Sequence, residues 1–422
     1  MYDKIVLAKG CTYSSDSSRT GINNNQIVVG GSGSGKTMSI TEPCLLNTEH
    51  RNLIVTVTKP RIIRKYADLL RQRGYRLETV NFAAPENSTA AFDPMCFVRT
   101  DMDITFLAQS LVMSDPKKKD SHADPYWDNA SISLLSALIA GALLRNPGAG
   151  LTEVLTMFRG LEIKFGDIIS TNYDYYFNGL HDTPRGRFAK MQWNSFCRLP
   201  SKTASCVFSS LSIMLDHMFT GELTQLLQMP EKVDFRELAQ EKSVLFVVSS
   251  PVNPSLNAFV SLFYAMAMKE LFEFAEEQPD GFLPIPTHMV CDDFATGAPI
   301  PNFDQYISII REKQLSVTLL CQSESQLEGM YGRSQAVTVI NNCDSYVYTG
   351  SMDLTTAMHI SQRLNMPVDE VLSMQLGTFA VFRRGEKPVV AQRYPILEDP
   401  LYRSLTGMAT PVRQPEPEVL AC

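Results

Sequence analysis

The sequence lacks paired cysteines, a secretion leader and an excess of basic residues. Its nine cysteines are scattered singly and form no CxxC pair, which argues against both a zinc site and a disulfide framework. The N-terminus, MYDKIVLAKG, has no basic start followed by a long apolar stretch. The formal net charge of −7 excludes a surface coated in basic residues for bulk nucleic-acid binding, so any DNA contact must be local. We expect a protein of the reducing cytosol.

The chain also lacks an apolar run long enough to cross a bilayer. The most apolar segment, ISLLSALIAGALL at Ile132–Leu144, falls short of the ~20 residues that a membrane-spanning helix needs. We interpret it as a buried core helix and expect a soluble protein. The length of 422 residues suits one large α/β domain with an inserted or appended unit.

A glycine-rich loop follows a short apolar run at Gln26–Val29. It fits the pattern G-x-x-x-x-G-K-[ST] and consists of Gly30, Gly31, Ser32, Gly33, Ser34, Gly35, Lys36 and Thr37. Glycines let backbone N–H groups turn toward phosphate oxygens, and the start of the following helix adds a favourable dipole. Lys36 would reach the β- and γ-phosphates of ATP, and the Thr37 hydroxyl would bind Mg²⁺. Pro43 would limit or kink the helix.

A second acidic element follows the apolar strand pattern at Thr287–Cys291. A P-loop needs a carboxylate at the end of a neighbouring strand, and Asp292 supplies it for Mg²⁺, directly or through water. Asp293 would orient or activate the attacking water. The sequence therefore predicts a P-loop ATPase with ATP and Mg²⁺ as its cofactors.

Strand and helix patterns alternate on both sides of a long helical block. Apolar strand patterns such as Asn52–Val57 precede residue 98 and return at Ser243–Val248, whereas the segment between them has mostly helical periodicity, for example over Ala204–Leu227. We predict a nucleotide-binding domain in two parts, residues 1–97 and 229–409, interrupted by an all-helical insertion at 98–228. Residues 410–422 are proline-rich and charged, which predicts a disordered tail. The predicted fold class is α/β, a RecA-like P-loop NTPase with a mostly parallel sheet.

The segment after the acidic strand resembles a known family. Asp292-Asp293-Phe294-Ala295, continuing to the QSESQL stretch that begins at Gln322, resembles the D-E-F-A to Q-S-x-S-Q-L block of type IV coupling proteins, the TraG/TraD-like ATPases of conjugation and type IV secretion. The P-loop with Pro43 and the Asp124-Pro125-Tyr126-Trp127 element, similar to the family's D-P-F-W, agree with it in the same order.

This resemblance implies two further site residues and a set of partners. Arg311 lies where the family carries an arginine that acts on the neighbouring subunit, and Gln322 lies where it has a glutamine able to sense the γ-phosphate. The implied partners are DNA, in single-stranded form, relaxase-type protein substrates and the membrane components of a type IV secretion system. The implied assembly is a homo-hexamer at the inner face of the cell membrane.

The sequence departs from the family pattern in three places, and two alternative functions remain open. Asp293 stands where the family usually has Glu, and Thr58-Lys59-Pro60 stands where it usually has D-P-K-G-E. The family usually carries N-terminal transmembrane helices and this sequence shows none, which leaves three readings open: a naturally soluble member, a partner of a separate membrane subunit, or a shortened form of a longer protein. A weakly hydrolysing docking platform for secretion substrates is therefore an alternative to a DNA-moving motor. A chromosome-type translocase of double-stranded DNA is a third possibility, against which the helical insertion and the DPYW element count.

Overall fold

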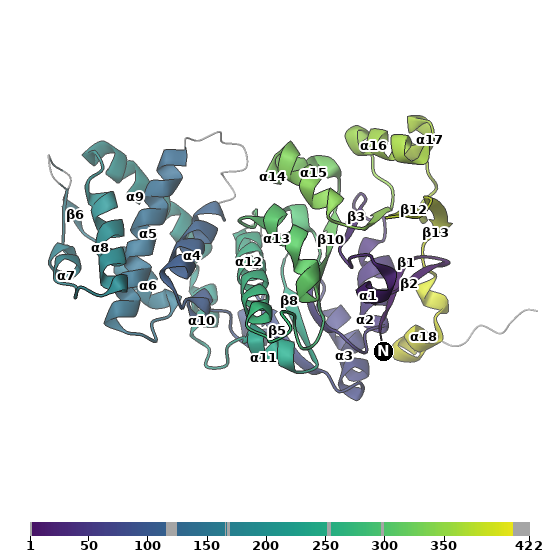
Figure 1. Ribbon diagram of the computed structural model, residues 1–422, viewed down its shortest axis with the longest axis horizontal. Coiled ribbons are helices and arrows are strands. Elements are labelled where there is room, and N and C mark those ends of the chain that lie inside the picture. Colours follow the sequence, from purple (N-terminus) through teal and green to yellow (C-terminus); the bar gives the residue numbers. More distant parts are fainter. Residues whose placement is uncertain are drawn as a thin grey trace, which may run out of the picture.

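The computed structural model consists of a twisted sheet flanked by helices and a separate block of helices beside it (Figure 1). The structure describes residues 2–114, 125–164, 166, 169–250, 255–296 and 299–407. Asp124 of the DPYW element and the predicted disordered tail at 410–422 lie outside these residues.

The central sheet has nine strands in the order β13-β12-β11-β3-β10-β9-β4-β8-β5. Strands from β11 to β5 all run parallel, whereas β12 and β13 add an antiparallel hairpin at one edge. This arrangement confirms the predicted mostly parallel α/β sheet. The strands are β3 (Gln26–Val29), β4 (Asn52–Val57), β5 (Arg76–Asn81), β8 (Ser243–Val248), β9 (Thr287–Cys291), β10 (Leu315–Cys321), β11 (Ser345–Tyr348), β12 (Thr378–Arg383) and β13 (Val389–Gln392).

The central strands of the sheet are buried on both faces, which explains their continuous apolar sequences. Along β4 the side chains alternate, so that Ile54 belongs to one hydrophobic cluster while Leu53 and Val55 belong to the other. The first cluster packs against α12 (Ser255–Glu276), α13 (Phe303–Ile309) and α15 (Arg333–Asn341). The second packs against α2 (Glu42–Leu46), α3 (Arg61–Gln72) and α18 (Pro400–Thr406). A small hairpin of β1 (Lys4–Ala8) and β2 (Cys11–Ser14) lies on this second side, with α1 (Ser17–Thr20) following it.

Three more helices follow strands β10 and β11 along the chain. α14 (Glu324–Tyr331) comes directly after β10, and α16 (Leu354–Leu364) and α17 (Val368–Leu372) connect β11 to β12. In Figure 1 the α16–α17 pair projects from the same side of the sheet as α14 and α15.

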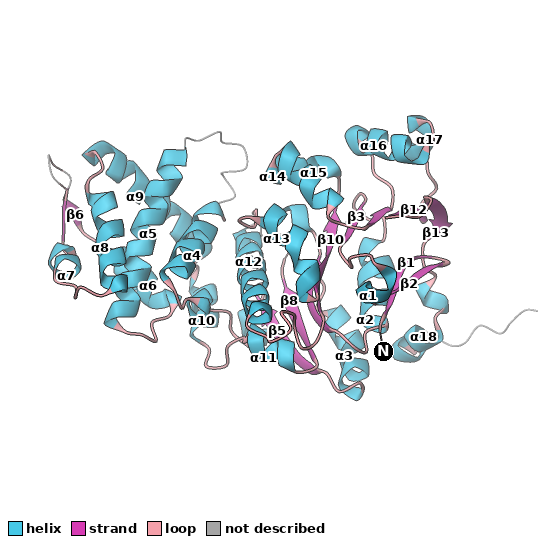
Figure 2. Cartoon of the chain, viewed as in Figure 1, coloured by secondary structure: helices cyan, strands magenta, loops and turns pink. Residues whose placement is uncertain are grey.

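Between β5 and β8 the chain leaves the sheet and forms the helical block, which Figure 2 shows almost entirely in cyan. Its main elements are α4 (Asp101–Met113), α5 (Pro125–Arg145), α6 (Leu151–Arg159), α7 (Asp174–Asn178), α8 (Pro184–Cys197), α9 (Ser201–Met218) and α10 (Gly221–Gln228). Only two very short strands, β6 (Ile163–Lys164) and β7 (Ser170–Thr171), occur among its described residues, and they pair with each other rather than with the central sheet. The domain boundaries given above stay predictions.

One part of the block differs from the sequence expectation. Helical periodicity over 204–227 predicted one helix, but the chain breaks between α9 and α10, where Phe219 and Thr220 leave the helical conformation. α5 is longer than the apolar run within it. By length and composition alone, its segment Tyr126–Arg145 is long and apolar enough to cross a membrane, but about two thirds of it is buried inside the protein. This is the burial of a core helix.

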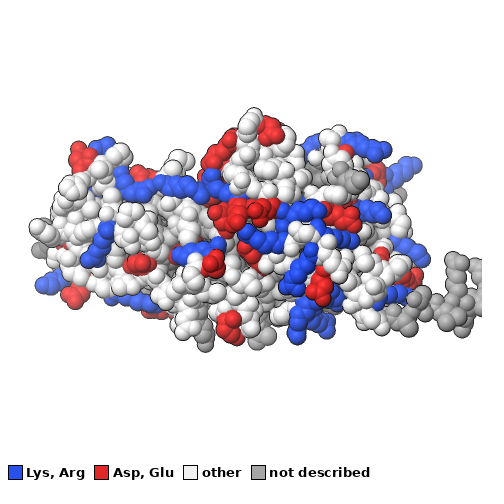
Figure 3. Space-filling model, turned by 90° about the horizontal axis from the view of Figure 1, so that it is seen from below, with Lys and Arg blue, Asp and Glu red and all other residues white. Residues whose placement is uncertain are grey.

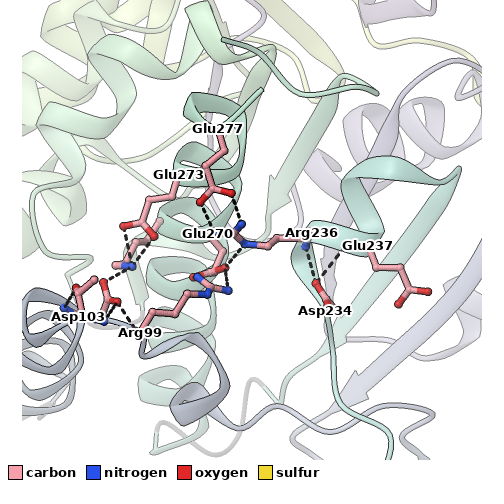
Figure 4. Close-up of polar contacts among 10 residues, drawn as sticks. Arg99, Asp103, Asp234, Arg236, Glu237, Glu270, Glu273 and Glu277 are labelled. Carbon is pink, nitrogen blue, oxygen red and sulfur yellow. Dashed lines mark hydrogen bonds and ion pairs between the residues drawn. The ribbon is translucent and has the colours of Figure 1, made fainter. Parts of the chain in front are cut away.

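A network of ion pairs fixes the helical block to the sheet region at α12 (Figure 4). The carboxylate of Glu270, 1% exposed, accepts two hydrogen bonds from Arg99, of 2.6 and 2.8 Å, and one of 3.2 Å from Arg236 of α11 (Phe235–Gln240). Beside it, Lys269 of α12 pairs with Asp103 of α4 at 2.6 Å. Arg99 precedes the block and Arg236 follows it, so both ends of the excursion are held by one helix.

We predict that Glu270→Ala destabilises the protein by about 2–4 kcal/mol, because it removes the shared partner of two arginines at a buried position. Chemical denaturation followed by circular dichroism measures the change. Glu277→Ala is the matched control. Its carboxylate also pairs with Arg236 but is 55% exposed, so its loss should cost under ~1 kcal/mol. Equal losses in the two variants would contradict the importance of the buried pair.

Candidate nucleotide site

The glycine-rich loop leaves the carboxyl end of β3 at the centre of the sheet. The Gly30 N–H donates to the carbonyl of Cys321 at 3.1 Å, and the Gly31 N–H donates to the carbonyl of Gly350 at 2.8 Å. A Cβ at Gly30 would lie 1.8 Å from Oγ1 of Thr349, so only glycine fits there. Gly33 and Gly35 have φ of +77° and +89°, the left-handed region that glycine adopts most easily. The loop therefore has the conformation that its composition predicted.

The helix after the loop starts with a widened turn. Residues Thr37–Thr41 form a π-helical turn, in which the Glu42 N–H donates to the carbonyl of Thr37, and α2 continues from Glu42. Pro43 lacks an N–H and its ring excludes the carbonyl four residues earlier, which accounts for the wider turn immediately before it. The predicted limit at Pro43 is thus present as a change of helix type.

Lys36 folds back over the loop. Its ammonium donates to the carbonyl of Gly31 at 3.2 Å and also to that of Gly30, and the residue is only 8% exposed. Burial lowers the pKa of Lys36, against the opposing charges of Asp293 and Asp292. A buried ammonium that hydrogen-bonds to carbonyl oxygens of a glycine-rich loop keeps its positive charge available for an anionic ligand.

Asp292 and Thr37 meet at the end of β9. The Thr37 hydroxyl donates to Oδ2 of Asp292 at 3.1 Å, and the Asp293 N–H donates to Oδ1 at 3.1 Å. Burial, followed by the charge of Asp293, raises the pKa of Asp292 to about 6. A hydroxyl and a carboxylate oxygen are the hard donors that suit Mg²⁺, which takes one or two protein ligands and completes its shell with phosphates and water. In the described parts of the chain, no group of three or more His, Cys, Asp or Glu side chains could hold a metal ion, so a metal here depends on this pair.

Asp293 has a backbone conformation that non-glycine residues seldom adopt. Its φ is +49°, and its carbonyl accepts bonds of 2.9 and 2.7 Å from the backbone and hydroxyl of Thr296, which hold the turn in place. Such conformations cost free energy and concentrate at functional sites. The turn lets two consecutive aspartates face different parts of one site.

One cavity of about 480 Å³ collects most of the predicted residues. It is lined by residues 32–38, by Asp293 and by Gln322, which directly follows β10. The parallel register explains this grouping, because Cys321 is level with Val29 and Leu319 is level with Cys291. The structure therefore brings together Ser32 to Thr37, Asp293 and Gln322. Asp292 joins them through its hydrogen bond with Thr37, whereas Gly30 and Gly31 do not line the cavity.

Arg311 lies elsewhere in the same chain. It belongs to the short 3₁₀ helix Ile310–Lys313, which precedes β10, whereas the glycine-rich loop follows the carboxyl end of the adjacent parallel strand β3. Its guanidinium donates to the carbonyl of Gly21 at 3.0 Å and lines a different cavity, of about 280 Å³, together with residues at the amino ends of β9 and β10. The structure does not bring Arg311 to its own chain's loop.

Sequence reasoning missed the opposite wall of the nucleotide cavity. Glu42, Thr58, Lys59, Arg61 and Ile62 line it. The position of Thr58 and Lys59 directly after the strand pattern at 52–57 was a usable signal, because parallel strands gather their carboxyl ends at one edge. Thr349 and Gly350, which brace the loop, follow β11 in the same way.

Comparisons with known proteins agree with this architecture. Residues 5–375 match the family described as type IV secretory system conjugative DNA transfer. A comparison with curated protein sequences gives no significant match.

Solved structures share the fold at low sequence identity. The bacterial conjugative coupling protein TrwBdeltaN70, in its unbound monoclinic form, is 17% identical with a TM-score of 0.66, over 93% of this chain and 89% of that one. The plasmid coupling protein TrwB in complex with a non-hydrolysable ATP analogue is also 17% identical with a TM-score of 0.66, over 89% and 86%. VirB4 of Thermoanaerobacter pseudethanolicus is 14% identical with a TM-score of 0.56, over 94% and 97%.

These matches confirm the RecA-like P-loop fold with its helical domain, and the extent of the family match settles membership. The chain belongs to the conjugative DNA-transfer family of type IV secretion systems.

Proposed function

We propose that this protein is an ATP-dependent coupling motor that recruits DNA or a DNA–protein substrate and drives it into a type IV secretion channel. The observation that carries the proposal is the Thr37–Asp292 contact beside Lys36, with Asp293 and Gln322 on the same cavity. Family membership supports the conjugative role. TrwB has been solved with a non-hydrolysable ATP analogue, with a GTP analogue and with ADP and Mg²⁺, which supports a nucleotide such as ATP, with Mg²⁺, as the cofactor here.

The residues divide the work on the bound nucleotide. A bound Mg²⁺ would neutralise part of the negative charge of the phosphates. In our proposal, backbone N–H groups of the loop and Lys36 hold the phosphates, and Thr37 and Asp292 hold the metal. Asp293 orients the attacking water, and Gln322 senses whether the γ-phosphate is present.

Arg311 requires a second subunit in this scheme. Because it lies beyond the opposite ends of the strands from its own loop, it would act on a neighbour's nucleotide, which calls for a ring. We infer a homo-hexamer with single-stranded DNA and relaxase-type proteins as substrates. It would work in the cytoplasm against the inner face of the membrane, beside the membrane components of the secretion system. The mixed charges in Figure 3 agree with local rather than bulk DNA contacts.

One observation favours a second function, a docking platform that hydrolyses ATP slowly. Asp293 has one methylene less than the family's usual Glu, which places its carboxylate farther from a water in the cavity. Measuring ATPase rate with and without single-stranded DNA, over a range of protein concentrations, separates the two functions. A motor should be stimulated by DNA and by concentration, whereas a platform should respond to neither.

We predict that Lys36→Ala reduces ATP hydrolysis by at least ~10²-fold without unfolding the protein, because the ammonium serves phosphate and bonds only loop carbonyls. Steady-state hydrolysis and thermal unfolding measure the two effects. Wild-type turnover in a folded variant would disprove the P-loop assignment.

We predict that Asp292→Asn stabilises the nucleotide-free protein at pH 8 while it weakens Mg²⁺-dependent ADP binding. The pKa of about 6 in the folded state exceeds the ordinary value of 3.8, so the ionised carboxylate costs stability above pH 6, by up to ~3 kcal/mol, and this cost fades as pH falls toward 4. Melting temperatures of both proteins at pH 8 and pH 5 test the sign. A variant that is less stable than wild type at pH 8 contradicts the prediction.

We predict that Arg311→Ala binds ATP as wild type does but loses turnover by ~10³-fold or more, since an arginine supplied in trans stabilises transition-state charge. Mixing it with Lys36→Ala protein should restore part of the activity, because some interfaces then pair an intact loop with an intact arginine. If mixed rings form and no activity returns, the arginine does not act across subunits.

A further inference from the structure

A second arginine approaches the glycine-rich loop from within the same chain. Arg393 directly follows β13, and its Nη1 lies 3.7 Å from the position that a Cβ would take on Gly35. The Oγ of Ser39 lies at the same distance from that point. The guanidinium therefore lies beside Gly35, the residue immediately before Lys36.

The backbone around Arg393 is fixed by two hydrogen bonds. The Arg393 N–H donates to the carbonyl of Gly377 at 2.7 Å, and the carbonyl of Gln392 accepts a 2.8 Å bond from the N–H of Lys9, which directly follows β1. The side chain then runs over Gly377, whose Cβ position lies 3.7 Å from Cδ of Arg393. Because Gly377 has no side chain and a φ of +87°, the stem can lie close to it on its way to Gly35. The β12–β13 hairpin thus positions Arg393, and the absence of side chains at Gly377 and Gly35 lets its side chain lie close to the loop.

The guanidinium has a charge but no partner for it. Among the described residues, no hydrogen bond or ion pair involves the Arg393 side chain, and the residue is exposed. The other arginines of the same hairpin are paired, Arg383 with Glu386 at 2.5 Å and Arg384 with Asp344 at 3.4 Å. An unpaired planar fork of N–H donors beside a phosphate-binding loop matches the oxygens of a phosphate.

The sheet order indicates which part of a nucleotide Arg393 would meet. Asp292, which marks the metal between the β- and γ-phosphates, follows β9, on one side of β3. Arg393 follows β13, on the other side of β3. It also lies beyond the family match, which ends at residue 375.

We propose that Arg393 is a second phosphate-binding cation beside Lys36, which contacts a nucleotide bound to its own chain on the α-phosphate side, away from the metal. The inference rests on the proposed nucleotide binding and adds a residue to it. Arg393 holds the ground-state nucleotide, whereas Arg311 acts in turnover on a neighbour's nucleotide. Removal of Arg393 therefore raises KM rather than lowering kcat.

The experiment measures Mg–ADP affinity by calorimetry, and KM and kcat for Mg–ATP, with the full chain. Arg393→Ala should weaken Mg–ADP binding and raise KM by about tenfold, the size of one lost charge-assisted contact, with kcat within about threefold of wild type. Arg393→Lys keeps the charge without the fork and should recover part of the loss. Lys387→Ala, an exposed cation in the turn of the same hairpin, should stay within about twofold of wild type.

The outcomes separate this inference from the function on which it rests. If wild type binds Mg–ADP and Arg393→Ala binds it equally well, or if Lys387→Ala loses as much, Arg393 is not a nucleotide contact. A fall in kcat at unchanged affinity also overturns the inference, because it assigns Arg393 to turnover. If the wild type itself does not bind Mg–ADP, the proposed function fails. Melting temperatures equal to wild type show that the losses do not come from unfolding.

Discussion

The site depends on the parallel alignment of β3, β10 and β9, whose carboxyl ends meet at one edge of the sheet. Each of these strands is followed at once by part of the proposed site: the glycine-rich loop after β3, Gln322 after β10 and Asp292 after β9. The Gly30–Cys321 backbone bond continues the ladder one step beyond the strands, so the loop starts in register with its neighbour. Fully buried strands fix this register, because a shift by one residue would turn apolar side chains out of both clusters.

This alignment places charges where the protein alone does not satisfy them. Lys36 is buried among carbonyl oxygens with a lowered pKa, and Asp292 is buried with a raised one. Each change of pKa reports a free-energy cost in the free protein. A phosphate chain with Mg²⁺ would offset both costs together, because it brings an anion to Lys36 and a cation to Asp292. The same desolvation that destabilises the free site thus favours the occupied one.

Sequence patterns predicted the features that depend on residues close together in the chain. The apolar strands, the loop and the acidic pair follow from residue type and spacing, and they lie where the patterns placed them. The hairpin of β12 and β13 was missed because β13, VVAQ, is only four residues long and largely exposed, so it gives a weak strand signal. The role of Arg393 depends on that hairpin, and the brace of Thr349 against Gly30 depends on the pairing of β11 with β3. Both bring together segments more than 300 residues apart in the sequence, so no pattern of neighbouring residues could predict them. The break between α9 and α10 was missed for a different reason, since the apolar periodicity continues across Phe219 and Thr220.

The opposite positions of Arg311 and the glycine-rich loop restrict how copies of this chain could assemble if Arg311 acts on a bound nucleotide. The two lie at opposite ends of parallel strands, so a single copy cannot use its own Arg311 on its own nucleotide without breaking the sheet. Two copies related by a twofold axis would use the same surface on both sides, whereas this contact joins two different surfaces of the chain. A contact between different surfaces is heterologous, and it closes only as a ring. In such a ring, Lys36, Thr37, Asp292 and Arg393 belong to one subunit and would set affinity. The residue that completes the transition state would come from the next subunit. Binding and turnover would then respond to different events, and turnover would depend on how adjacent subunits sit against each other, which is the property that a motor requires.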